Sequence, residues 1–246
     1  MRFPFQERSS WVVVIGIDDY KGQQQLKSAV ADAVAITEYF INHLSVPPGN
    51  ITKLLARHGD EESVRSSADY PTRKNILSKL WSLHQDPRIR YGDTIVIFYA
   101  GHGSSYNIRR LCFKKSGRNR INVEEVRETL NPSGPLMDAI APVDRGEEDS
   151  DPDYIGTRVP DICDRELNAI FTLTRQKKGP NIVFIADCCY SASIARDASA
   201  SVKYRALPSS GGDQVERMLS RGQCNIDAWA NASQVRQLHV ICYEEI

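Results

Sequence analysis

The chain has 246 residues, of which 41% are hydrophobic and 25% charged, with 31 basic and 31 acidic side chains. Such a composition is typical of a globular domain with a substantial core, and the balanced charge favours neither nucleic acid nor a membrane surface as a partner. No apolar stretch approaches the roughly 20 residues of a membrane-spanning helix, and the first residues lack the apolar run of a secretory signal. Six cysteines without a C-x-x-C pair indicate reduced thiols and a cytoplasmic protein, with a nuclear pool left open.

The first third of the chain predicts an alternation of strands and helices. A continuous β-branched run at 11–17 indicates a buried strand, helical spacing follows over 30–44, and 51–55 predicts a second strand. A polar segment at 57–70 reads as a loop, and Pro71-Thr72 then begins a helix.

The rest of the chain continues this alternation. We expect, in order, a strand at 94–100, a polar segment at 104–133 with a helix at 123–130, a short strand at 139–143, an acidic loop at 144–153, a helix at 164–176, a strand at 181–187, a poorly ordered connection at 191–234 and a last strand at 237–243. Alternating strands and helices predict one α/β domain with a mostly parallel central sheet and helices on both faces.

A cysteine and a histidine follow two of these strands directly. Cys188-Cys189 closes the apolar run that ends at Asp187, and His102 closes the run at 94–100. The carboxyl ends of parallel strands share one edge of the sheet, where binding and chemistry gather. A thiolate activated by an imidazole is a nucleophile for acyl transfer, and the N–H groups of Gly103 and Cys189 can form an oxyanion hole.

Two other interpretations of these residues remain open. Cysteine commonly ends buried strands for packing reasons alone, although the equivalent placement of His102 favours a functional pair. A structural zinc site would need the residues Cys163, Cys188, Cys189 and His102. Adjacent cysteines do not easily chelate one ion, and the spacing fits no usual zinc pattern.

The two motifs resemble those of a known family. Tyr99-Ala-Gly-His-Gly103 and Asp187-Cys-Cys-Tyr-Ser191 are similar to the histidine and cysteine motifs of metacaspases, the caspase-like cysteine peptidases of family C14, clan CD. The family cysteine motif reads Asp-[Ser/Cys]-Cys-His-Ser-Gly, which implies that Cys189 is the nucleophile. In this chain Tyr190 replaces the histidine of the motif and Ala192 replaces its glycine. Weaker similarity extends over Val13–Ile17, Leu26–Ala33, Ala141–Asp144 and Asp164–Leu167.

The resemblance implies a caspase-like three-layer sandwich and a cysteine endopeptidase that cleaves after Arg or Lys through a dyad of Cys189 and His102. It further implies self-processing and a role in proteolysis or cell-death-like pathways. The acidic S1 pocket of the family corresponds to Asp187 and Asp32, although a first-turn acid such as Asp32 is also favoured by the helix dipole alone. The expected partners are protein or peptide substrates with a basic P1 residue, and the chain itself is expected to be a monomer or to self-associate weakly.

The resemblance also bears on metals. The chemistry requires no cofactor, but calcium activates many metacaspases, and Asp144 and Asp164 match two ligand positions. Arg165 stands where the family has a second acid, while further carboxylates lie nearby between 147 and 153. An acidic surface loop is more often merely solvated.

We expect residues 1–10 to be an amino-terminal extension and 11–246 to be the peptidase domain. The domain is expected to be truncated at its carboxyl end, because the Gly-x-Phe-Thr segment, helix and strand that follow in the family are absent. The alternative function is a catalytically silent caspase-like domain that serves as an interaction scaffold.

Overall fold

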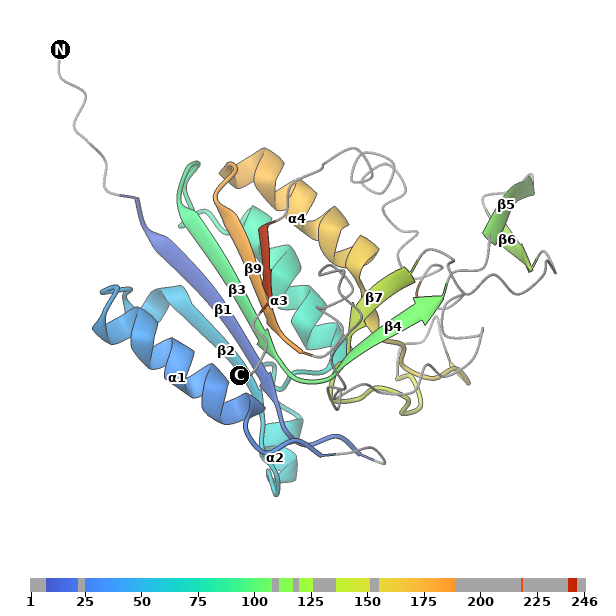
Figure 1. The fold of residues 1–246 in the computed structure, drawn as a ribbon, viewed down its shortest axis with the longest axis horizontal. Helices are drawn as coiled ribbons and strands as arrows, with labels where there is room; N and C mark the ends of the chain where they lie inside the picture. The colour runs from blue at the N-terminus through green and yellow to red at the C-terminus, as the bar shows by residue number, and fades with distance from the viewer. Residues whose placement is uncertain are drawn as a thin grey trace, which may run out of the picture.

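A twisted parallel sheet forms the centre of the molecule, with helices on both faces (Figure 1). The computed structural model describes residues 8–21, 25–107, 111–116, 120–125, 136–150, 155–188, 218 and 239–242. Its central sheet has the strand order β10-β9-β3-β1-β2, and every neighbouring pair in it is parallel. The strands are β1 (Ser10–Ile17), β2 (Ile51–Ala56), β3 (Thr94–Ala100), β9 (Ile182–Asp187) and β10 (His239–Cys242).

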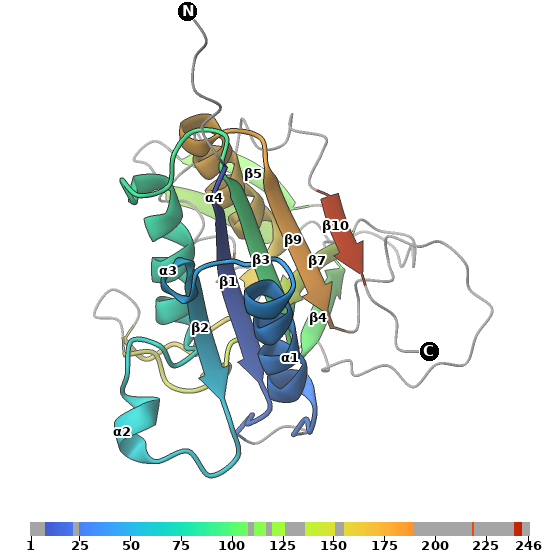
Figure 2. The ribbon, with the colours of Figure 1, turned by 90° about the vertical axis from the view of Figure 1, so that its left-hand side faces the viewer.

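Helices cover the two faces of this sheet. Figure 2 shows α1 (Ala29–Asn42) in front of the sheet and α4 (Asp164–Lys178) behind it, on the same side as α3 (Arg73–Gln85). Arg73 of α3 and Glu166 of α4 form a buried ion pair with an N–O distance of 2.6 Å, which ties these two helices together. Short helices at Pro48–Asn50 (η1) and Glu62–Arg65 (α2) flank β2.

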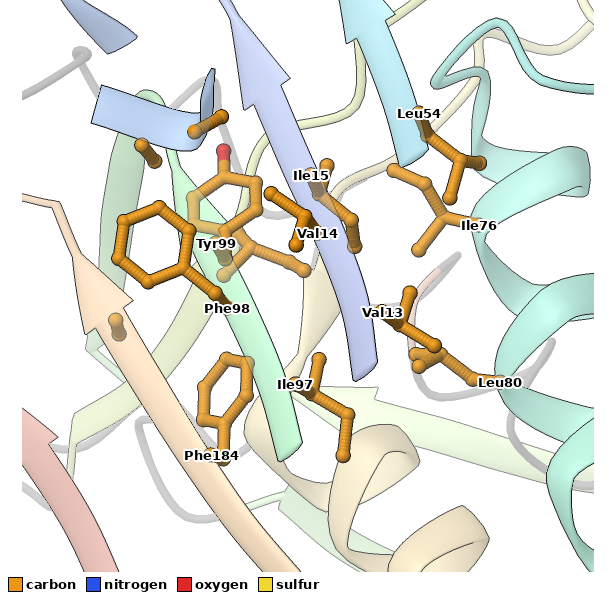
Figure 3. Close-up of a cluster of buried hydrophobic side chains, with 14 of the residues drawn as sticks. Val13, Val14, Ile15, Leu54, Ile76, Leu80, Ile97, Phe98, Tyr99 and Phe184 are labelled. Carbon is orange, nitrogen blue, oxygen red and sulfur yellow. The ribbon is translucent and has the colours of Figure 1, made fainter. Parts of the chain in front are cut away.

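The core fills both gaps between sheet and helices. Figure 3 shows Val13 of β1 together with Leu54, Ile76 and Leu80, where the sheet meets α3. On the opposite face, a Cβ atom at Gly16 would lie 2.6 Å from the Cβ of Ala33, so α1 packs directly against the backbone of β1. Successive residues of a strand face opposite sides, so the continuous apolar runs of β1 and β3 supply both cores.

Smaller strands lie beyond the carboxyl ends of the central strands. The chain turns after β3 into β4 (Gly103–Asn107), which pairs with β7 (Leu136–Ile140), and β7 pairs with β8 (Ile162–Cys163), all antiparallel. A two-stranded unit of β5 (Leu111–Ser116) and β6 (Arg120–Glu125) completes the described strands.

The structure confirms the predicted α/β class, with its parallel sheet between two helical layers. It corrects three local predictions. Residues 123–125 belong to strand β6 and not to a helix, because Ile121 and Val123 alternate with polar residues, a period of two. The strand expected at 139–143 lies instead at Leu136–Ile140, since Pro142 has no N–H to donate to a ladder.

The third correction is α2, which occupies part of the expected loop at 57–70. Residues 126–130 and the connection expected at 191–234, apart from Met218, lie outside the described residues. Within the described part of the chain, no helix has the length and apolar character needed to cross a membrane.

Candidate active site

The carboxyl ends of β3 and β9 lie side by side, as the sequence predicts. Ala100 is in register with Asp187, and the N–H of Gly101 lies 3.3 Å from the carbonyl oxygen of Asp187. Gly101 and Cys188 are thus the first residues after the two neighbouring strands, and His102 is the second residue after β3. Cys189, the expected nucleophile, lies outside the described residues.

His102 is almost fully buried, with 1% of its surface exposed, and its backbone is held by two tyrosine hydroxyls. Its N–H donates to Tyr20 Oη at 2.9 Å, and Tyr99 Oη donates to its carbonyl oxygen at 2.6 Å. The Tyr20 ring also packs against the imidazole, with 4.6 Å between ring centroids. These contacts fix the position and tilt of the histidine before any substrate binds.

The tyrosine pair explains why glycine precedes the histidine. A Cβ atom at Gly101 would lie 2.6 Å from Tyr20 Oη and 2.7 Å from Tyr99 Oη, closer than these atoms can approach. Burial raises the pKa of both tyrosines, so both hydroxyls keep their protons and remain donors. The sequence motif contains Tyr99 but gives no reason for its hydroxyl, and no pattern in the sequence marks Tyr20.

The N–H of Gly103 points away from strand β7. The N–H of Ala141 donates to the carbonyl oxygen of His102 at 3.0 Å, so that carbonyl faces β7. In a trans peptide the next N–H points the opposite way, and Gly103 is thus at a non-hydrogen-bonded position of the β4–β7 pair. The N–H of Gly103 therefore takes no part in the β4–β7 ladder.

A buried polar network centred on Asp161 holds strand β4 in place. Asp161 is fully buried and forms an ion pair with Arg145 at 2.5 Å. Its other carboxylate oxygen accepts hydrogen bonds from Ser104 Oγ and, at 2.5 Å, from Tyr106 Oη. Ser104 and Tyr106 are the second and fourth residues of β4, so the network holds the strand that begins directly after His102. No pattern in the sequence marks Asp161 for this role.

The other predicted side chains are distributed as follows. Asp187 is half-buried at the end of β9, and Asp32 is half-buried in the first turn of α1. Cys188 is half-buried and packs against the main hydrophobic core. Cys163 is fully buried, and burial raises the pKa of its thiol to about 12, which makes it a poor nucleophile and metal ligand at neutral pH.

The calcium candidates do not converge on one site in the described part of the chain. Asp144 Oδ1 accepts the N–H of Arg73 at 2.8 Å and so caps helix α3, while Asp164 is exposed at the start of α4. Asp144 lines a polar cavity of about 150 Å³, but Lys21 and Arg65 line it too. Among the described residues, no group of three or more His, Cys, Asp or Glu side chains is placed to hold a metal ion. The acids at 151 and 153 lie outside the described ranges, so calcium binding by this part of the chain stays a prediction.

Comparison with known proteins assigns the family. The family model described as "Metacaspase, peptidase C14 domain" matches residues 12–197, which is most of the chain. The chain belongs to the metacaspase peptidase C14 family. Membership supports cysteine peptidase function for this chain.

The individual proteins that match this chain share only part of its sequence or length. Metacaspase-1 of Plasmodium berghei (strain Anka) is 33% identical over 114 residues, which cover 45% of this chain and 18% of the Plasmodium protein. The match thus spans less than a fifth of that relative's length. The crystal structure of protein GSU0716 from Geobacter sulfurreducens aligns with a TM-score of 0.48 at 14% identity, covering 95% of this chain and 67% of that chain.

Proposed function

We propose that this metacaspase is a cysteine endopeptidase that hydrolyses peptide bonds after Arg or Lys, with Cys189 as nucleophile and His102 as general base. The observation that carries the proposal is the alignment of the ends of β3 and β9. It brings a buried, rigidly held histidine beside the strand whose continuation contains Cys189. Family membership adds the cysteine peptidase class.

The proposed reaction follows from the properties of the two groups. His102 takes the proton of the Cys189 thiol, and the thiolate attacks the scissile carbonyl carbon to give a tetrahedral intermediate. The N–H groups of Gly103 and Cys189 donate to the oxyanion. The imidazolium then protonates the leaving amine, and water, activated by the same imidazole, hydrolyses the thioester and releases the acid product.

The proposed specificity depends on carboxylates at the same sheet edge. A guanidinium or ammonium leaving water needs paired negative charge, which Asp187 and Asp32 are proposed to supply. The segment 191–222 contains several basic residues, namely Arg196, Lys203, Arg205, Arg217 and Arg221. A protease with this specificity would find sites for self-processing there, and we place its activity in proteolysis or cell-death-like pathways.

Fluorogenic peptides that differ only in the P1 residue test this function. The wild-type chain should cleave substrates with Arg or Lys at P1 and ignore Asp, and the assay is run with and without calcium because calcium activation remains a prediction. Cys189→Ala should abolish cleavage. Cys188→Ala is the matched control, and it should retain most of the activity because Cys188 packs against the core.

Two results would contradict the proposal. Efficient cleavage after Asp would exclude the basic S1 specificity. A folded wild-type protein that cleaves none of the peptides, under any calcium concentration, would favour the silent interaction domain instead.

A further inference from the structure

The two carboxylates expected in the S1 pocket lie on the same face of the sheet. Gly16, Ala100 and Asp187 are in register across β1, β3 and β9, and aligned residues of parallel strands project to the same side. Gly16 faces helix α1, because a Cβ there would meet Ala33. Asp187 is therefore on the α1 face, where Asp32 lies in the first turn of α1.

A third carboxylate shares this face and this edge. Asp18 comes two residues after Gly16, and its N–H continues the ladder by donating to the carbonyl oxygen of Ala56 at 3.0 Å. Because the backbone remains in register, the strand alternation that turns Gly16 toward α1 also turns Asp18 toward α1. Asp18 thus follows β1 at the edge where Asp187 ends β9.

Asp18 is buried without a partner for one of its carboxylate oxygens. Only 7% of its surface is exposed, and its Oδ1 atom accepts no hydrogen bond among the described residues. The neighbouring Asp19 is equally buried, but Arg65 donates to it at 2.7 Å. A buried carboxylate oxygen that accepts no hydrogen bond is costly, and a bound cation that donates to it relieves that cost.

We propose that Asp18 is a specificity-determining residue of the S1 pocket and supplies a third carboxylate to the guanidinium of a P1 arginine. This inference rests on the proposed peptidase function. A guanidinium presents five donors in a planar fork, so it can engage carboxylates that approach from different strands. A metal ion is a poorer occupant, because among the described residues no three acids are gathered closely enough to chelate one.

The test compares substrates that carry Arg or citrulline at P1, since citrulline has nearly the same shape without the charge. The Asp18→Asn variant should lower the ratio of kcat/KM for Arg over citrulline by about tenfold or more, mainly through KM, because it removes a charge that acts on the bound cation. Asp69→Asn is the matched control. It removes the same charge from an exposed side chain that pairs with Lys79, and the ratio should not change.

A binding measurement makes the result independent of turnover. In the Cys189→Ala background, Asp18→Asn should weaken binding of an arginine-terminated peptide amide by a similar factor. The melting temperature should stay equal or rise, because the variant removes a buried charge that has one oxygen without a hydrogen-bond partner among the described residues. A residue that merely supports the fold would instead lower the melting temperature and reduce cleavage of both substrates equally.

The outcomes separate this inference from the proposed function. If the wild-type chain prefers Arg but Asp18→Asn leaves the Arg-to-citrulline ratio unchanged, or reduces both substrates equally, the role of Asp18 is refuted and the peptidase function stands. If the wild-type chain neither binds nor cleaves arginyl peptides, the peptidase function fails and the inference fails with it.

Discussion

Two tyrosine hydroxyls hold the backbone of His102 in place, and a general base needs such a fixed position. Tyr99→Phe removes the hydroxyl that lies 2.6 Å from the carbonyl oxygen of His102. A hydrogen bond of this kind contributes about 0.5–1.5 kcal/mol, so we expect kcat on an arginyl substrate to fall roughly three- to tenfold with little change in KM. Tyr91→Phe, at a residue that is 75% exposed, is the control and should behave as wild type. An unchanged kcat for Tyr99→Phe would show that the Tyr99 hydroxyl has no part in catalysis.

Cysteines in this chain differ in environment, and alkylation can distinguish them. Burial raises the pKa of Cys163 to about 12, so its thiolate fraction at pH 8 is negligible. In the folded protein at pH 8, peptide mapping after iodoacetamide treatment should find Cys163 unmodified and Cys189 modified. The same treatment in urea should modify both. Rapid labelling of Cys163 in the folded state would contradict its assignment as a packing residue.

The elements around the site are joined by the network centred on Asp161. Arg145 and Asp161 are both buried, and Asp161 also receives hydrogen bonds from Ser104 and Tyr106 of β4. Asp161→Asn leaves the Arg145 charge without its counter-ion, which typically costs about 3–5 kcal/mol. Urea unfolding should report a loss of that size. The control variant Asp86→Asn breaks an exposed pair with Arg88 and should cost no more than about 1 kcal/mol. Equal losses in the two variants would mean that the Asp161 network adds no more stability than an exposed ion pair.

Elements with strong periodicity could be predicted from the sequence. The apolar runs of β1, β3 and β9 and the helical spacing of α1, α3 and α4 depend on local side-chain pattern, which a sequence displays directly. Strand β6 is hard to predict because it has only two apolar residues, Ile121 and Val123, with the polar Asn122 between them and two acids after them. Strand β7 was misplaced because its register is set by pairing with β4, a contact that no local pattern encodes.

Some residues of the candidate site could be predicted from the sequence and others could not. The strand-end positions of His102 and Asp187 follow from the run of each strand, and the topology places the two ends together. Tyr20, Asp18 and Asp161 could not be assigned from the sequence, because their roles depend on which residues they contact across the fold. A tyrosine or aspartate after a strand has many ordinary explanations until those contacts are known.

The stability of the whole molecule should depend on alkaline pH through Cys163. Its pKa is raised from an ordinary value of roughly 8.5 to about 12 on folding. The contribution of a raised pKa is fully present below the unfolded value and is lost as pH rises toward the folded value. The wild-type protein should therefore lose about 2 kcal/mol of unfolding free energy relative to Cys163→Ala between pH 8 and pH 10. A constant difference between the two proteins over that range would show that the thiol ionises equally in both states.

At the scale of the whole molecule, Cys189, activated by His102, is the proposed reactive group of a basic-specific metacaspase. The most direct measurement is covalent labelling with an arginyl peptide chloromethyl ketone, followed by peptide mapping. We expect a single label on Cys189, strongly slowed labelling in His102→Ala and normal labelling in Cys188→Ala. A label on Cys188, or labelling that does not depend on His102, would contradict this assignment.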